Sequence, residues 1–212
     1  MRKTVEAIGK IYFDTSHPAG FSGFAKLRRH LPSTVPSTAI KNFLLKQESH
    51  TIHKQNVRRF KRDVVFSTNI DDNWQADLMD VRNISKHNDG IKFIFVVIEV
   101  FSKYLWTRCL KDKSANSVRD ALRDIIETSH RAPQTLQTDK GRELINRTVE
   151  RFLKENDVSL YSTENSDVKA SIAERVIRTI KSKMYKYFTH SGRYRYVEVL
   201  QSIVDAYNKT GH

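Results

Sequence analysis

The sequence predicts an α/β protein in which a mixed five-stranded sheet is flanked by helices and preceded by a small helical module. Residues 67–212 alternate between β-rich and helical patterns of apolar residues. Residues 1–57 show only short helical patterns, which Pro and Gly interrupt. Charge divides the chain in the same way, because residues 1–66 hold 13 Lys and Arg against 4 Asp and Glu, whereas residues 67–212 hold 24 against 20.

The composition excludes several classes of protein. With 212 residues and 39% hydrophobic residues, the chain is long and apolar enough to fold. A single Cys excludes a disulfide framework and a Cys-pair zinc site. The longest apolar run, residues 93–98, is far shorter than the ~20 residues that a membrane helix needs, so we expect no membrane partner. The net charge of +13 favours a nucleic acid as partner.

Residues 1–57 form the predicted N-terminal module. We expect helices over residues 1–13 and 21–31, and a third with Pro36 in its first turn that ends near Gln47. Three short helices with a tight turn and many basic residues resemble a helix-turn-helix DNA-binding module. A helical hairpin without a DNA role fits the pattern equally well.

A basic linker is expected over residues 58–66. Its cations are Arg58, Arg59, Lys61 and Arg62. Such a run can neutralise DNA phosphates or serve as a nuclear-import signal, and a solvated linker is the alternative. We therefore expect DNA contact here and a nuclear location.

Residues 67–212 form the predicted core domain. Strands are expected over residues 73–81, 91–101 and 103–110, and their short connections predict an antiparallel meander. Ser114 is expected to cap a helix that runs to residue 129, followed by a strand over 135–138. A helix over 142–155, a strand over 158–161 and helices over 169–188 and 194–208 complete the domain.

Three carboxylates are candidate metal ligands. Asp77 lies in the first predicted strand, Asp139 directly follows the fourth, and Glu174 lies near the start of the next-to-last helix. Strand ends of mixed α/β sheets are common ligand sites, and carboxylate oxygens suit Mg²⁺. Two such ions can promote attack on a phosphodiester. The chain has 24 acidic residues, so a set of unrelated surface acids is the alternative.

Two cations accompany Glu174 on its helix. Arg178 and Lys181 follow it at i+4 and i+7, which places all three side chains on one helical face. A strand of phosphates along this face would be held beside the metal ions. A solvated face with a Glu–Arg pair is the alternative interpretation.

Four stretches of this sequence resemble the retroviral-type integrase superfamily, and in particular the integrases of Maverick or Polinton DNA transposons. The stretches are IDDNWQADL at 70–78, VFSKY at 100–104, LQTDKG at 136–141, and Glu174-Arg175 with Arg178-Thr179. Residues 17–23, HPAGFSG, resemble the N-terminal part of those transposon integrases.

The resemblance implies an RNase H-like fold and a metal site at Asp77, Asp139 and Glu174 that holds two Mg²⁺ or Mn²⁺ ions. It also implies contacts of Arg178 and Lys181 with element-end DNA, and a homo-oligomer in the active state. The implied activity is cleavage near the 3′ end of an element, followed by strand transfer into target DNA. Because no further module follows the last helix, we expect a truncated, transposon-derived protein. A catalytically inactive nucleic-acid-binding remnant is the alternative.

Overall fold

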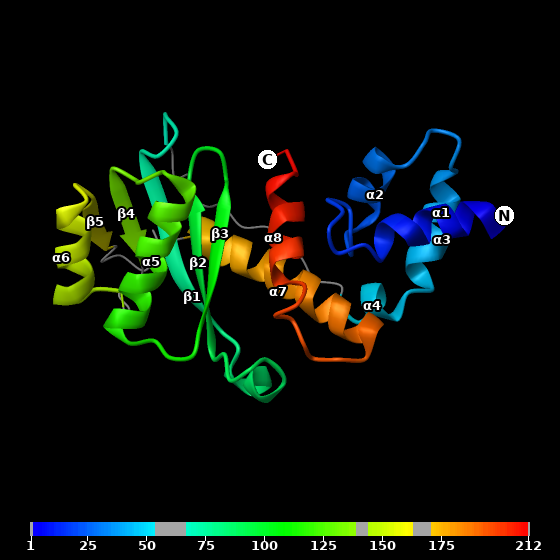
Figure 1. Ribbon diagram of the computed structural model, residues 1–212. Coiled ribbons are helices and arrows are strands. Elements are labelled where there is room, and N and C mark those ends of the chain that lie inside the picture. The colour runs from blue at the N-terminus through cyan, green and yellow to red at the C-terminus, as the bar shows by residue number, and fades with distance from the viewer. Residues whose placement is uncertain (1, 54–66, 139–143, 163–170, 212) are drawn as a thin grey trace. The chain divides into compact units, whose positions relative to one another are not determined.

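The protein divides into two compact units in the computed structural model, which describes residues 2–53, 67–138, 144–162 and 171–211. The helical unit comprises residues 1–59 and 179–211, and the sheet unit comprises residues 60–178 (Figure 1). One long helix, α7 (Ser171–Ser191), contributes its first turns to the sheet unit and its remaining turns to the helical unit. The domain boundaries 1–57, 58–66 and 67–212 stay a prediction.

The sheet unit contains the predicted mixed five-stranded sheet. Its strands are β1 (Asn73–Asp80), β2 (Phe93–Glu99), β3 (Leu105–Leu110), β4 (Thr135–Thr138) and β5 (Ser159–Ser162). They lie in the order β3-β2-β1-β4-β5. The first three pair antiparallel, as the short connections predicted, whereas β1 with β4 and β4 with β5 pair parallel. The 3-10 helix η1 (Arg82–His87), which the sequence did not predict, connects β1 and β2.

Two helices pack against one face of this sheet. They are α5 (Ala115–Ser129) and α6 (Arg147–Glu155), and their apolar stripes share a core with Trp74 and Trp106. The predicted cap of α5 is confirmed, because the Ser114 side chain accepts a hydrogen bond from the Ser117 N–H at 3.2 Å. The helix was predicted to begin at residue 142, but residues 144–146 are not helical and α6 begins at Arg147. The Asn146 side chain caps α6 by accepting hydrogen bonds from two backbone N–H groups, at 3.0 and 3.1 Å.

The helical unit has its own apolar core. Its elements are α1 (Arg2–Tyr12), α2 (Phe24–His30), α3 (Ser37–Leu45), α4 (Glu48–Thr51) and α8 (Leu200–Asn208). Ile8, Tyr12, Leu27 and Ile40 are fully buried where the first three helices meet. These three helices were predicted, and α4 was not. None of the helices in the described part of the chain has the length and hydropathy needed to cross a bilayer.

The loop after α1 is held by two lysines of α7. Lys183 is buried, and its Nζ donates to the carbonyl of Gly20 at 2.9 Å. The Lys186 Nζ donates to the carbonyl of Phe21, also at 2.9 Å. At Gly20 a Cβ would lie 1.9 Å from the carbonyl oxygen of Asp14, so the chain passes itself too closely for any side chain there. The HPAGFSG stretch therefore has a structural role in this unit.

Candidate active site

Asp77 lies on the sheet face opposite α5 and α6. Side chains alternate along a strand, and Trp74 and Ala76 point into the core beneath those helices, so Gln75 and Asp77 point to the other face. The Asp77 carboxylate is half-buried, and it accepts a hydrogen bond from the N–H of Leu78 at 2.7 Å. Asp80, the other acid of β1, is exposed and forms an ion pair of 2.6 Å with Arg82.

Gln75 joins β1 to the first turn of α7. Its Oε1 accepts hydrogen bonds from the N–H groups of Ile172 and Ala173, both at 3.1 Å. Its Nε2 donates to the Oε1 of Gln137 on β4 at 2.9 Å. The side chain is fully buried. In this way a strand residue provides the acceptor that an N-cap side chain normally gives to the first N–H groups of a helix.

Glu174 follows Ala173 directly, and its side chain is half-buried. Gln75 therefore fixes the backbone next to Glu174 on the sheet face that carries Asp77. Gln75 and Asp77 are two positions apart on β1, about 6.6 Å along the strand. The structure thus places the backbone of Glu174 on the sheet face to which Asp77 points. Sequence reasoning missed the role of Gln75, although a polar residue between the buried Trp74 and Ala76 was a usable signal.

Asp139, the third predicted carboxylate, lies outside the described residues. It is bonded to Thr138, the last residue of β4, which pairs with Ala76, the neighbour of Asp77. The Thr138 hydroxyl is buried and has no hydrogen-bond partner among the described residues. In the ranges that the structure describes, which omit 139–143, no three Asp, Glu, His or Cys side chains converge to hold a metal. Asp77 and Glu174 supply only oxygen donors, the ligand type that Mg²⁺ and Mn²⁺ take.

The predicted DNA-contacting cations lie partly within the described residues. Arg178 and Lys181 are exposed on α7. At 3.6 residues per turn they lie within an arc of about 60° together with Glu174. Arg58, Arg59, Lys61 and Arg62 lie outside the described residues.

Two acids stabilise the fold, one directly before and one within an integrase-like stretch. Glu99 is fully buried, and its carboxylate accepts hydrogen bonds from the N–H groups of Phe101, at 2.7 Å, and Ser102 in the β2–β3 turn. Asp71 accepts a hydrogen bond from the Trp74 indole at 2.8 Å and forms an ion pair of 2.7 Å with Arg131. These acids therefore anchor a turn and the start of β1.

Sequence comparisons identify the core domain. Residues 69–166 match the family model described as integrase core domain. A stretch of 125 residues is 38% identical to an uncharacterized transposon-derived protein of Caenorhabditis elegans. That alignment covers 59% of this chain but 43% of the relative, so the chain spans less than half of the relative's length.

Structural comparisons confirm the fold. The simian T-cell lymphotropic virus intasome in complex with PP2A regulatory subunit B56 gamma matches with a TM-score of 0.59 and 15% identity, over 87% of this chain and 64% of that chain. The HTLV-2 integrase catalytic core domain in complex with magnesium, in its dimeric form, matches with a TM-score of 0.52 and 16% identity, over 64% of this chain and 84% of that one. The BIV integrase catalytic core domain matches with a TM-score of 0.54 and 17% identity, over 67% and 86%. Residues 69–166 are therefore similar to an integrase core domain, and the sheet unit has the RNase H-like fold of integrase catalytic cores.

Proposed function

We propose that this protein is a metal-dependent DNA integrase derived from a transposon of the Maverick or Polinton type. One observation carries the proposal: Gln75 links the start of α7 to β1, which puts the backbone of Glu174 on the sheet face to which Asp77 points. Asp139 is bonded to a residue that pairs next to Asp77.

Asp77, Asp139 and Glu174 would hold two Mg²⁺ or Mn²⁺ ions. When bound, such ions supply Lewis-acid activation of the attacking oxygen and stabilise charge on the leaving oxygen. The three carboxylates would be ionised in that state, because the cations offset their mutual repulsion.

The proposed reaction exchanges one phosphodiester bond for another. In the cleavage step a water oxygen attacks phosphorus near the end of the element, and the bond to the deoxyribose 3′ oxygen breaks. In the transfer step the freed 3′ hydroxyl attacks a phosphodiester of target DNA, a new P–O bond forms, and a target 3′ oxygen leaves. Bonds made and broken balance in each step, so neither a covalent enzyme intermediate nor a nucleotide cofactor is required.

Arg178 and Lys181 would bind phosphates beside the reacting strand, and the run from Arg58 to Arg62 would add contacts outside the core. Because two element ends must be joined to one target, we propose a homo-oligomer as the active form. We also propose a nuclear location, where the DNA substrate is found.

The test measures nicking of a plasmid and joining of a labelled duplex by the whole chain in Mg²⁺, in Mn²⁺ and in EDTA. We expect Asp77→Asn to abolish both products, because it removes a ligand charge. Asp80→Asn is the matched control, since Asp80 is an exposed acid of the same strand, and we expect it to retain activity. Binding of Mn²⁺, measured by calorimetry, should fall only in Asp77→Asn.

Two results would refute the proposal. One is the absence of metal-dependent products in the wild-type protein, and the other is equal product from Asp77→Asn and wild type. Retained DNA binding without any cleavage would instead identify the protein as an inactive nucleic-acid-binding remnant.

A further inference from the structure

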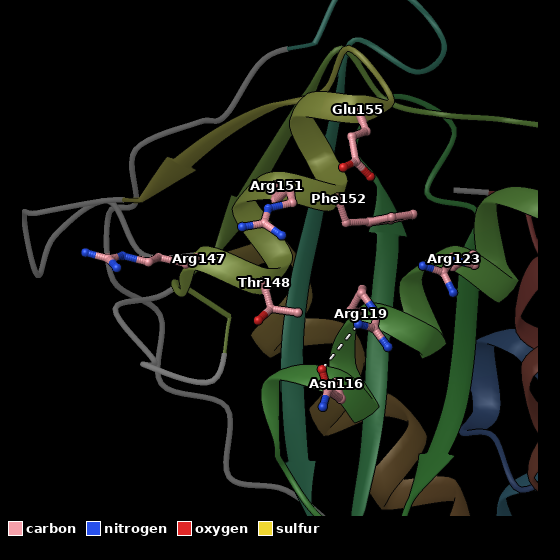
Figure 2. Close-up of a pocket in the computed structure, with 8 residues that line it drawn as sticks. All are labelled: Asn116, Arg119, Arg123, Arg147, Thr148, Arg151, Phe152 and Glu155. Carbon is pink, nitrogen blue, oxygen red and sulfur yellow. Dashed lines mark hydrogen bonds between the residues drawn. The ribbon is translucent and has the colours of Figure 1, made fainter.

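A groove lined with arginines lies between α5 and α6, on the sheet face opposite Asp77. Figure 2 shows the residues that line it, which come from both helices. The groove is open and encloses about 290 Å³. Four of the lining residues are arginines: Arg119 and Arg123 on α5, and Arg147 and Arg151 on α6. Within each pair the residues are four positions apart, so one helical turn, a rise of about 6 Å, separates them.

The groove has a surplus of positive charge. On α5, Arg119 and Arg123 share a single acid, since Asp120 lies 2.7 Å from one guanidinium and 3.5 Å from the other. On α6, Arg147 and Arg151 are exposed and form no ion pair with any residue that the structure describes. Glu155 is the one acid in the lining. Figure 2 shows the Arg147 side chain pointing away from the other three arginines, although Arg147 lines the groove. The surplus of positive charge along the groove favours an anionic ligand.

The groove offers little apolar surface for a protein partner. Its aromatic side chain, Phe152, belongs to the core and is only 6% exposed. The Arg123 guanidinium lies over this ring, 5.4 Å from its centroid. Peptide docking sites usually contain a buried apolar or aromatic anchor, and such an anchor is not available here. Recognition must therefore depend on charge, and the planar guanidinium groups match phosphate oxygens well.

We propose that the α5–α6 groove binds backbone phosphates of a nucleic acid strand. The contacts are sequence-independent, as contacts of arginine with phosphate are. They lie on the face of the sheet that carries Trp74 and Ala76, so they are separate from the carboxylates at Asp77 and Glu174. This second surface would hold DNA without metal and without taking part in the reaction.

The test uses the double variant Arg147→Glu/Arg151→Glu, called the groove variant. Neither arginine has an ion-pair partner to lose among the described residues, and a glutamate at the first position of α6 favours the helix dipole, so the fold is retained. The matched control is Lys86→Glu/Lys92→Glu, which changes the charge equally at two exposed positions of the same unit outside the groove. Fluorescence anisotropy with a mixed-sequence duplex, over a range of salt concentrations, measures the affinity.

We expect the groove variant to bind duplex DNA on the order of tenfold more weakly, with the log–log salt slope reduced by about 1 to 2, because one or two phosphate contacts are lost. The control should lose clearly less affinity. An equal loss in both double variants would overturn the proposal, because overall charge would then explain the effect. It would also be overturned if a polyglutamate peptide bound the groove as tightly as DNA does.

The outcome is independent of catalysis. Adding the groove substitutions to Asp77→Asn should weaken DNA binding by the same factor as adding them to the wild-type protein, even if neither protein cleaves DNA. Loss of that sensitivity in Asp77→Asn would mean that the two surfaces are not separate.

Discussion

Gln75 provides the sharpest test of how the candidate active site is built. Gln75→Leu keeps the approximate volume of the side chain but removes three hydrogen bonds at once. The N–H of Ala173 is left buried without an acceptor, which costs about 1–3 kcal/mol. The Ile172 N–H is half-buried, and the Gln137 Oε1 keeps a long hydrogen bond of 3.5 Å from the Asn73 amide. Each of these two losses therefore costs less free energy than the loss at Ala173. Together we expect a loss of about 3 kcal/mol in the free energy of unfolding.

Two measurements test this reasoning. Urea unfolding gives the change in free energy, and amide hydrogen exchange at Ile172 and Ala173 reports whether the first turn of α7 opens. The matched control is Gln137→Leu, which removes the Gln75–Gln137 hydrogen bond but keeps both bonds from Gln75 to α7.

Faster exchange at the start of α7 in Gln75→Leu, without a similar change in Gln137→Leu, would confirm that Gln75 caps the helix. If Glu174 is a metal ligand, the affinity for Mn²⁺ should fall in the same variant. Unchanged exchange at Ile172 and Ala173 in Gln75→Leu would refute the role of Gln75 outright.

Three further predictions follow from the structure. Gly20→Ala should destabilise the helical unit by about 2–4 kcal/mol in urea unfolding, because its Cβ would lie 1.9 Å from the Asp14 carbonyl oxygen. Gly23→Ala is the control, since a Cβ there has open space and should cost under about 1 kcal/mol. Equal costs in the two variants would contradict the steric argument. Burial lowers the pKa of Lys183 from 10.5 to about 8, so between pH 8 and 10.5 the unfolded chain binds the proton that the folded chain has lost. The free energy of unfolding should therefore rise with pH in this window by up to about 3 kcal/mol more than it does in Lys183→Met. Urea unfolding of both proteins at pH 7.5 and pH 10 measures this difference. The same pH dependence in both proteins would mean that Lys183 is solvated. The groove variant should lose the same DNA affinity in EDTA as in Mg²⁺, because arginines bind phosphate without metal. Fluorescence anisotropy measures this loss, and a loss seen only in Mg²⁺ would contradict the prediction.

The sheet could be predicted from the sequence because its signals are local. The run at residues 93–98 contains only apolar, mostly β-branched or aromatic residues, and β2 is buried at every position. The short connections before and after it predicted the antiparallel pairing of β1, β2 and β3. The start of α6 was predicted too early because the apolar stripe begins before the helix does, and Asn146 decides the boundary by capping the first N–H groups.

The links between distant residues could not be predicted in this way. Gln75 contacts residues 62 and about 97 positions away, and no periodicity encodes such a pairing. On this helix the sequence analysis singled out Arg178 and Lys181 but not Lys183, which is buried and donates to the carbonyl of Gly20. A lysine is buried where backbone carbonyls from another segment accept its hydrogen bonds, and only the folded chain brings those carbonyls to it.

The distribution of charge over the sheet unit explains why its net charge says little about its partners. Residues 60–178 hold 20 Lys and Arg against 19 Asp and Glu. In the fold, however, Asp77 and the start of α7 with Glu174 lie on one face of β1, while the arginines of the α5–α6 groove lie over the other. A nucleic acid that approaches the carboxylates would meet their negative charge beside the cations Arg178 and Lys181, so metal ions would be needed at the carboxylates themselves. One that approaches the groove meets guanidinium groups directly. The two proposals therefore assign metal-independent phosphate binding to one face of a near-neutral domain and metal-dependent chemistry to the other.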